Sequence, residues 1–182
     1  MLGLGSNLGD SKLIICRAIR ELEEVLKGLR AASLYETEPL GVKDQGRFIN
    51  TAVAGFYPSD ENASSAAELL KAIHLLEAKY GRDRSRERRW GERFLDIDIL
   101  LFGNLAVNEP NLVIPHPRLK ERRFALQPLL ELLPRSREPG TGLSYRGVCD
   151  ALPDQGVIKI SGGNSYYEDY CLGVKKRVNY SE

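Results

Sequence analysis

Short stretches of alternating hydrophobic and polar residues recur along this chain, and each of them predicts a β-strand. The clearest covers residues 94–102, where one face is formed by Leu95, Ile97, Ile99 and Leu101. Asp96, Asp98 and Leu100 share the opposite face, because successive side chains of a strand point to opposite sides. Further strands are expected at residues 1–4, 30–37, 47–56 and 157–160.

Apolar residues at helical spacing predict four helices between these strands. The first is expected to begin near Asp10 and to stop at Gly28, with an apolar face formed by Ile15, Ile19, Leu22 and Leu26. The second begins with the capping-box pattern Ser65-Ala-Ala-Glu68 and stops at Gly81. Two more are expected at residues 125–133 and about 144–152.

The order of these elements predicts the fold. Strand, helix, strand, strand, helix, strand, with a further helix behind, is typical of a ferredoxin-like arrangement. We therefore expect an α+β protein, a ferredoxin-like three-layer sandwich in which a mostly antiparallel sheet is flanked by helices. Residues 1–160 are expected to form this domain, and residues 161–182, which lack a clear period, an appendage of unknown role.

Composition and charge argue against several classes of partner. The formal net charge of the 182 residues is +1, so no global basic field recruits nucleic acid or an anionic membrane. No apolar run approaches the length of a membrane span, and the start, MLGLGSNLGD, lacks the features of a signal peptide. The three cysteines, at 16, 149 and 171, have no metal-ligand spacing and are expected to be free thiols. We therefore expect a cytoplasmic protein, a monomer with a dimer as the alternative.

Two carboxylates lie close together on the strand at residues 94–102. Asp96 and Asp98 stand about 7 Å apart by strand rise, and at an effective dielectric of about 20 they repel by roughly 2 kcal/mol. A divalent cation would offset this repulsion, and Mg²⁺ is usually held by one or two carboxylates plus substrate phosphates.

The stretch before this strand is rich in arginine. Its six arginines are Arg82, Arg84, Arg86, Arg88, Arg89 and Arg93. Taken alone, such a run is often a solvated loop, and an Asp-x-Asp strand is often a device against edge-to-edge pairing. Because guanidinium groups bind phosphate oxygens bidentately, the two features side by side indicate a polyphosphate site. The polar segment 83–92 is expected to be a lid that becomes ordered over the bound polyphosphate.

Four motifs in order now resemble a known family. They are Gly5-Ser-Asn-Leu-Gly9; Tyr35-Glu-Thr-Glu-Pro-Leu-Gly41 with Phe48-Ile-Asn50; Arg89-Trp-Gly-Glu-Arg93-Phe-Leu-Asp96-Ile-Asp98; and Pro115-His-Pro-Arg118 with Arg122-Arg-Phe124-x-Leu-x-Pro-Leu129. Together they resemble 6-hydroxymethyl-7,8-dihydropterin pyrophosphokinases over roughly residues 1–160. The third motif is the most specific.

The resemblance implies an activity and its phosphate chemistry. Enzymes of this family transfer diphosphate from ATP to a pterin alcohol in folate biosynthesis and release AMP. Two Mg²⁺ ions are expected on Asp96 and Asp98, with Arg82 and Arg93 on the phosphates as catalytic residues. Because the chain is one residue longer than the family pattern between Gly81 and Trp90, Arg82 or Arg84, and Arg88 or Arg89, remain alternatives. The ATP site implied by the resemblance consists of Glu77, Arg82, Arg84, Arg89, Arg93, Ile99, His116 and Arg122.

The resemblance also implies a pterin site. The ring is expected to be stacked between Phe48 and Phe124 under a loop that carries Trp90, with its edge read by Asn50. Backbone groups around residues 37–40 are expected to read the edge as well. The residues implied are Thr37, Glu38, Pro39, Leu40, Phe48, Asn50, Trp90, Asp96 and Phe124.

Two other classes remain open at this stage. A ferredoxin-like sheet with exposed aromatic residues and a basic loop is compatible with a single-stranded RNA binder, although Asp96 and Asp98 would repel phosphate without a metal. A phosphoryl or nucleotidyl transferase with a different acceptor is the second alternative. The nucleotide released from ATP separates the latter from a pyrophosphokinase.

Overall fold

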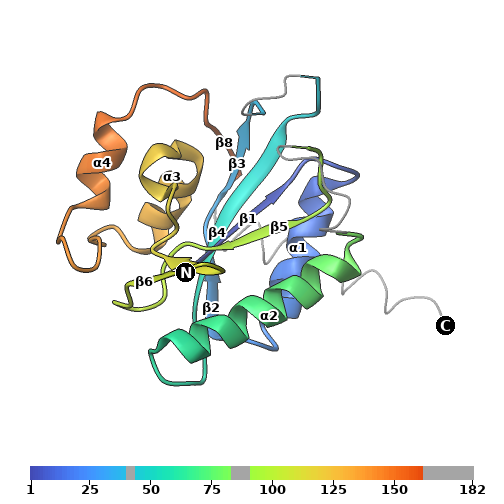
Figure 1. Ribbon diagram of the computed structural model, residues 1–182. Helices are drawn as coiled ribbons and strands as arrows, with labels where there is room; N and C mark the ends of the chain where they lie inside the picture. The colour runs from blue at the N-terminus through green and yellow to red at the C-terminus, as the bar shows by residue number, and fades with distance from the viewer. Residues whose placement is uncertain (40–43, 83–90, 162–182) are drawn as a thin grey trace.

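A single antiparallel sheet forms the centre of the protein, whose computed structural model describes residues 1–39, 44–82 and 91–161. The sheet runs β5 (Asp96–Ile99), β1 (Leu2–Ser6), β4 (Phe48–Phe56), β3 (Leu34–Thr37) and β8 (Ile158–Ser161), and β2 (Lys27–Ala31) also pairs with β4. Every pairing in this sheet is antiparallel, and β5 lies at one edge (Figure 1).

Helices cover both faces of this sheet. Figure 1 shows α1 (Ser11–Leu22) and α2 (Ala63–Lys79) on one side, and α3 (Arg123–Leu132) and α4 (Tyr145–Ala151) on the other. A hairpin of β6 (Val107–Glu109) and β7 (Leu112–Ile114) and a short 3-10 helix (Leu119–Glu121) connect β5 to α3. The α+β prediction is confirmed. Three strands, β2, β3 and β4, lie between α1 and α2 where two were predicted, because the stretch expected as one strand at residues 30–37 is divided between β2 and β3. The finer ferredoxin-like description stays a prediction.

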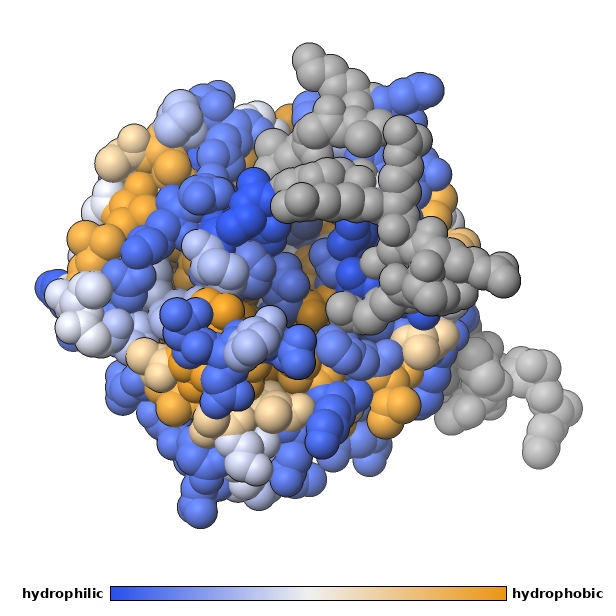
Figure 2. Space-filling view, in the orientation of Figure 1, coloured by the Kyte–Doolittle hydropathy of each residue, from blue (hydrophilic) through white to orange (hydrophobic). Residues whose placement is uncertain are grey.

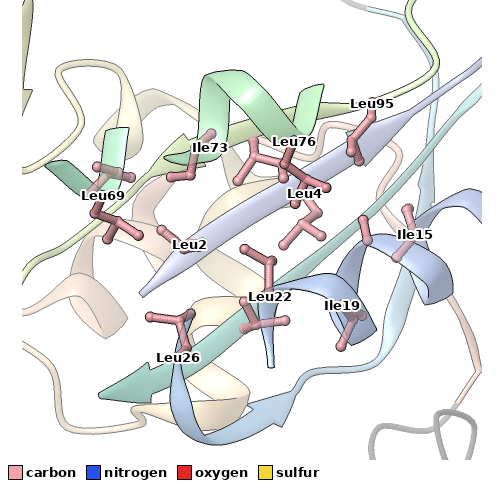
Figure 3. Packing of buried hydrophobic residues seen from close by; sticks show 14 of the residues in the cluster. Leu2, Leu4, Ile15, Ile19, Leu22, Leu26, Leu69, Ile73, Leu76 and Leu95 are labelled. Atoms are coloured by element: carbon pink, nitrogen blue, oxygen red, sulfur yellow. The ribbon is translucent and has the colours of Figure 1, made fainter. Parts of the chain in front are cut away.

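The larger core lies between the sheet and the pair α1 and α2. Along β1, Leu2 and Leu4 point to this side, where they meet Ile19 and Leu22 of α1 and Ile73 of α2 (Figure 3). All five side chains are at most 3% exposed. Because burying one such side chain stabilises the fold by about 1.5–3 kcal/mol, this cluster fixes both helices on the sheet.

The β1 residues that point to the opposite face of the sheet, toward α3, are glycines. Gly3 and Gly5 lie there, and a Cβ at Gly5 would be 3.1 Å from Asn50 Oδ1. A second core, centred on Leu126 and Leu129 of α3 and on Tyr145 of α4, fills the part of this face away from Gly5. The glycines therefore let the Leu100 and Asn50 side chains approach the backbone of β1 closely on this face.

Glu131 ties α3 to the far edge of the sheet. Its Oε2 accepts a hydrogen bond of 2.6 Å from the Ser33 amide, its Oε1 accepts one of 3.0 Å from Ser33 Oγ, and Lys159 Nζ also pairs with it. Burial raises the pKa of this carboxyl, but the hydrogen bonds from Lys159 and Ser33 outweigh burial, so its pKa lies below the ordinary value.

Two helix boundaries differ from the prediction. The first helix ends at Leu22, and Gly28 lies in β2 with φ 58°, where the register of the strand shifts. Leu26 is buried in the core, but it is not a helical residue. The second helix is capped by Asn62, whose side chain accepts a hydrogen bond of 2.9 Å from the Ser65 amide. Ser65 is therefore inside the helix, because an Asn three residues earlier provides the acceptor first.

The strand at residues 94–102 is shorter than predicted. The pairing with β1 covers Asp96–Ile99, and the alternation ends there, because Leu100 and Leu101 both join the second core. The expectation of three free thiols is also wrong at one position: Cys149 is free and buried, whereas Cys16 is disulfide-bonded.

Several predictions fall on residues outside the described ranges. These are the role of the appendage after residue 161, the lid at 83–92 for its residues 83–90, and the positions of Leu40, Arg84, Arg89 and Trp90. Within the described ranges, no helix is both long and apolar enough to cross a lipid bilayer.

Candidate active site

The two aspartates of β5 face the side of the sheet that carries α3. Ile97 and Ile99 are buried in the larger core at 2% and 5% exposure, so the alternation of the strand turns Asp96 and Asp98 the other way. Both aspartates line the same cavity as Phe124 of α3. The predicted common face of the two carboxylates is therefore confirmed.

Two arginines pair with Asp96. Arg82 Nη1 lies 2.5 Å from Asp96 Oδ1, and Arg93 Nη1 lies 3.0 Å from Asp96 Oδ2. The same Nη1 of Arg82 also pairs with Glu77, which is fully buried in the last turn of α2. Each oxygen of Asp96 thus receives one guanidinium group, and the two arginines lie on either side of the carboxylate.

Asp98 lies among Arg122 and His116. Arg122 Nη1 is 3.4 Å and His116 Nε2 is 3.6 Å from Asp98 Oδ2. Burial, followed by repulsion from Asp96, raises the pKa of Asp98 above its ordinary value. Such an environment favours a bound cation, which would stabilise the ionised form.

His116 is held as a neutral imidazole. The amide of Arg118 donates a hydrogen bond of 3.1 Å to His116 Nδ1, so the proton of the neutral ring sits on Nε2 and points toward Asp98. Burial lowers the pKa of His116, and the nearby Asp98 only partly offsets this effect. Near neutral pH, His116 is therefore a hydrogen-bond donor without a charge.

The donors at this site suit a metal ion that shares its ligands with a substrate. Among the residues that the structure describes, no group of three or more His, Cys, Asp or Glu side chains is placed to hold a metal ion alone. Asp96 and Asp98 offer two carboxylates, and Mg²⁺ commonly takes one or two carboxylates with phosphate oxygens and water completing its shell. The residues present fit that mode of binding.

A cavity opens between the sheet and α3, next to the two aspartates. Its enclosed volume is about 120 Å³, and it is partly open to solvent. Its lining comprises Gly3, Leu4, Gly5, Thr37, Glu38, Gln45, Phe48, Asn50, Thr51, Arg93, Asp96, Asp98, Leu100, Arg122, Phe124 and Ala125. In Figure 2 the face turned to the viewer is hollowed near its centre, and hydrophilic residues border the hollow.

Aromatic and amide groups line the inner part of this cavity. Phe48 begins β4 and Phe124 lies in the first turn of α3, so the two rings reach the cavity from different layers. The Arg122 guanidinium lies 5.7 Å from the centre of the Phe124 ring, which holds both groups by a cation–π contact. Asn50 Nδ2 donates a hydrogen bond of 2.9 Å to Thr37 Oγ1, which fixes the orientation of the amide.

Most of the predicted site residues that are described gather around this cavity. Six of the nine predicted pterin residues line it: Thr37, Glu38, Phe48, Asn50, Asp96 and Phe124. Arg82, Arg93, His116 and Arg122 surround the two aspartates. The side chain of Ile99 is in the larger core, Pro39 is not among the lining residues, and Glu77 lies behind Asp96, away from the lining.

Sequence reasoning left the function of Asn7 unassigned. Its Oδ1 accepts a hydrogen bond of 2.8 Å from the Arg93 amide, and its own amide donates one of 3.1 Å to the Arg93 carbonyl oxygen. Its Nδ2 also reaches Gln45 Oε1 at 3.1 Å. Asn7 therefore holds the arginine that pairs with Asp96. The only signal for this role is its place in the first family motif.

Paired arginines and carboxylates beside an aromatic cavity are suited to moving phosphate groups from a polyphosphate onto a flat organic acceptor. The fold and the site therefore define a phosphotransferase.

Comparisons with known proteins define the family. The family model described as 7,8-dihydro-6-hydroxymethylpterin-pyrophosphokinase (HPPK) matches residues 1–134. The 2-amino-4-hydroxy-6-hydroxymethyldihydropteridine pyrophosphokinase of Bacillus subtilis is 36% identical over 142 residues, 77% of this chain and 81% of that protein. Its namesake from Aquifex aeolicus is 39% identical over 139 residues, 76% of this chain and 82% of that protein. The chain belongs to the HPPK family, and it is a pyrophosphokinase of folate synthesis.

Solved structures agree at the level of the fold. The chain of wild-type Plasmodium falciparum HPPK-DHPS aligns with a TM-score of 0.61 at 16% identity, covering 82% of this chain and 43% of that one. The Folate synthesis bifunctional protein of Arabidopsis thaliana is 37% identical over 134 residues, which is 73% of this chain and only 26% of that protein. Both are longer proteins of which this chain matches a part.

Proposed function

We propose that the chain transfers diphosphate from ATP to 6-hydroxymethyl-7,8-dihydropterin in the cavity between the sheet and α3, and that it releases AMP. The observation that carries this proposal is the adjacency of two binding surfaces. An aromatic and amide-lined cavity opens directly onto Asp96 and Asp98, which are surrounded by arginines. An acceptor seated in the cavity would present its alcohol to phosphates bound at the aspartates.

The inner cavity residues suit a pterin ring. Phe48 and Phe124 both line the cavity, and we expect the flat pterin to lie between them, because stacking on aromatic rings would stabilise it without using its polar edge. Asn50 is oriented by Thr37, so its amide oxygen can accept hydrogen bonds from the ring edge. Backbone groups of residues 37–40 and the Trp90 loop would complete this site. Leu40 and Trp90 are outside the described residues and remain expectations.

The outer residues suit the polyphosphate of ATP. Arg82 and Arg93 are anchored by Asp96, and a triphosphate could replace this carboxylate as their partner or share them with it. Arg122 and the neutral His116 can donate hydrogen bonds to phosphate oxygens near Asp98. Arg84 and Arg89 would add to this set, and the backbone of Ile99 would lie beside the adenine.

Two Mg²⁺ ions are expected on Asp96 and Asp98 when ATP binds, where they would neutralise charge on the phosphates and activate the alcohol. The chain's own groups do the positioning. The arginines stabilise negative charge that develops around the β-phosphorus, and the cavity holds the alcohol in line for attack. Asp98 must be ionised for this role. Burial and the neighbouring Asp96 raise its pKa, so a bound cation would stabilise the ionised form.

Several expectations about the whole protein belong to the same proposal. Small molecules are its substrates, and the local arginine cluster serves phosphate rather than nucleic acid. We expect a cytoplasmic monomer, with a dimer as the alternative. Residues 1–160 form the catalytic domain, and the segment that follows is an appendage without a part in catalysis.

The nucleotide product tests the proposed function. Purified protein is incubated with ATP, Mg²⁺ and 6-hydroxymethyl-7,8-dihydropterin, and the nucleotides are separated by chromatography. Stoichiometric AMP that forms only with the pterin present is the expected result. ADP in place of AMP would show attack at the γ-phosphorus. A lack of pterin-dependent turnover would contradict the choice of acceptor.

A further inference from the structure

Glu77 is a charged side chain with no exposed surface. It lies in the last turn of α2, and its exposure is 0%. Removing a carboxylate from water is costly unless charged or polar partners replace the water. Two such partners are Arg82 and the backbone amide of Ile97, which come from the loop after α2 and from β5.

The contact with Ile97 closes the open edge of the sheet. β5 pairs with β1 on one side, and no described strand pairs with its other side. The amide of Ile97 points outward and donates a hydrogen bond of 2.8 Å to Glu77 Oε1. Edge strands expose such groups to water or to other chains, and here a helix side chain occupies the place of a neighbouring strand.

The contact with Arg82 connects Glu77 to Asp96, which precedes Ile97 on β5. Arg82 Nη1 pairs with Glu77 Oε1 and lies 2.5 Å from Asp96 Oδ1. The backbone also joins the two residues, because the Arg82 amide donates a hydrogen bond of 3.2 Å to the Glu77 carbonyl oxygen. Glu77 therefore touches both the backbone between Asp96 and Asp98 and the guanidinium group that pairs with Asp96.

We propose that Glu77 is a positioning residue for the phosphate site, rather than a ligand of ATP. It holds the strand segment that carries Asp96 and Asp98, and it also holds Arg82. The two carboxylates and the guanidinium group of Arg82 therefore stay at a constant distance from one another. This inference rests on the proposed function, since it assigns a task within that site. A displacement of about 1 Å in such groups is enough to lower turnover on the order of a hundredfold.

Two other roles for Glu77 make different predictions. If Glu77 bound ATP directly, its loss would chiefly raise the KM for ATP. If it merely completed the protein core, its loss would lower thermal stability, and activity would fall no more than in any variant of equal stability. A positioning role predicts loss of kcat together with loosening of the Ile97 amide.

The experiment compares two variants with a matched control. Glu77→Ala removes both contacts. Glu77→Gln keeps an oxygen that can accept from the Ile97 amide, but it removes the charge that pairs with Arg82. Ile73→Val is the control, because Ile73 lies on the same helix, is fully buried and contacts the core instead of the site. The measurements are kcat, the KM for ATP, the Tm, and amide hydrogen exchange of Ile97 without substrates.

In Glu77→Ala we expect exchange at Ile97 to accelerate about tenfold or more relative to amides of β1, since its acceptor is gone. We expect kcat to fall roughly a hundredfold, while the KM for ATP changes less than about threefold. In Glu77→Gln, exchange at Ile97 should stay within about threefold of wild type, with kcat lowered about tenfold. Ile73→Val should keep kcat within about twofold despite a lower Tm.

A raised KM for ATP with unchanged kcat would overturn the proposal, and so would unchanged exchange at Ile97 in Glu77→Ala. If Glu77→Ala does not fold, Glu77→Gln decides. If Glu77→Gln loses more kcat than Ile73→Val for a similar decrease in Tm, the result supports the positioning role. If the two variants lose kcat equally, the proposal is overturned. Failure of the proposed function would look different, because wild-type protein would then form no pterin-dependent AMP, whatever the exchange at Ile97.

Discussion

Replacing Asp96 with alanine removes the carboxylate on which the proposed phosphate site converges. In the structure this group accepts from Arg82 Nη1 at 2.5 Å and from Arg93 Nη1 at 3.0 Å. The side chain is 27% exposed, so its loss leaves the two cores intact, and we expect Asp96→Ala to fold. The two arginines lose the partner that orients them, and the proposed metal site loses one of its two carboxylates.

The size of the effect on turnover follows from these contacts. A hydrogen bond to a charged group contributes about 1.5–3 kcal/mol, so the two arginines lose at least roughly 3 kcal/mol of restraint. Each ~1.4 kcal/mol corresponds to a factor of about ten in rate. Losing this restraint together with one of the two proposed metal ligands should lower kcat on the order of a hundredfold. Asp98→Ala is expected to behave similarly.

The assay measures pterin-dependent AMP at saturating ATP, with circular dichroism and the Tm as checks on folding. Asp150→Ala is the matched control, because Asp150 is an exposed aspartate on α4. It should retain wild-type kcat. An Asp96→Ala protein that folds and keeps more than about a tenth of the wild-type kcat would refute the assignment of Asp96 to the site.

Three further outcomes are expected. Phe124→Ala should raise the KM for the pterin by roughly tenfold or more and change kcat less, because it removes one stacking surface of the cavity; an unchanged KM would move the pterin elsewhere. Glu131→Gln should reduce the loss of Tm as the pH falls into the acid range. The pKa of Glu131 is lower in the folded protein than in the unfolded chain, so the ionised carboxyl stabilises the fold at a pH above its pKa in the unfolded chain. This stabilisation is lost as the pH falls through the pKa of Glu131 in the folded protein. A loss of Tm at acid pH equal to that of wild type would contradict this. Deleting the chain after Ser161 should leave kcat within about twofold, and an insoluble product would show that the segment is structural.

Local patterns determined much of the fold and the proposed site in advance. The two-residue period of β5 puts Asp96 and Asp98 on one face, because the backbone geometry of a strand leaves no other arrangement. The same period places Phe48 and Asn50 together on β4. The resemblance of the motifs to a known family then assigned most of the cavity residues to one predicted site. These include Phe124, which is distant in the sequence from Phe48 and Asn50.

The ends of the helices and strands were harder to predict from the sequence, because residues that are close in space compete with the local signals. Ser65 has a capping pattern, yet Asn62 takes the cap. Gly28 has the character of a helix stop, yet it takes its positive φ in an irregular strand. In both cases the sequence is compatible with two local structures, and the packing of the whole chain determines which of them forms.

The sequence by itself therefore determined the types of the main elements, the shared face of the aspartates and the family. Only the tertiary structure decided which partners the buried polar groups have. Glu77 meets the Ile97 amide across 20 positions of sequence, and Asn7 meets Arg93 across 86. Such pairs carry no periodic signal, because they depend on how α2 and the first turn pack beside the edge strand. That packing is set by the apolar side chains of the whole core, and no short stretch of sequence contains it.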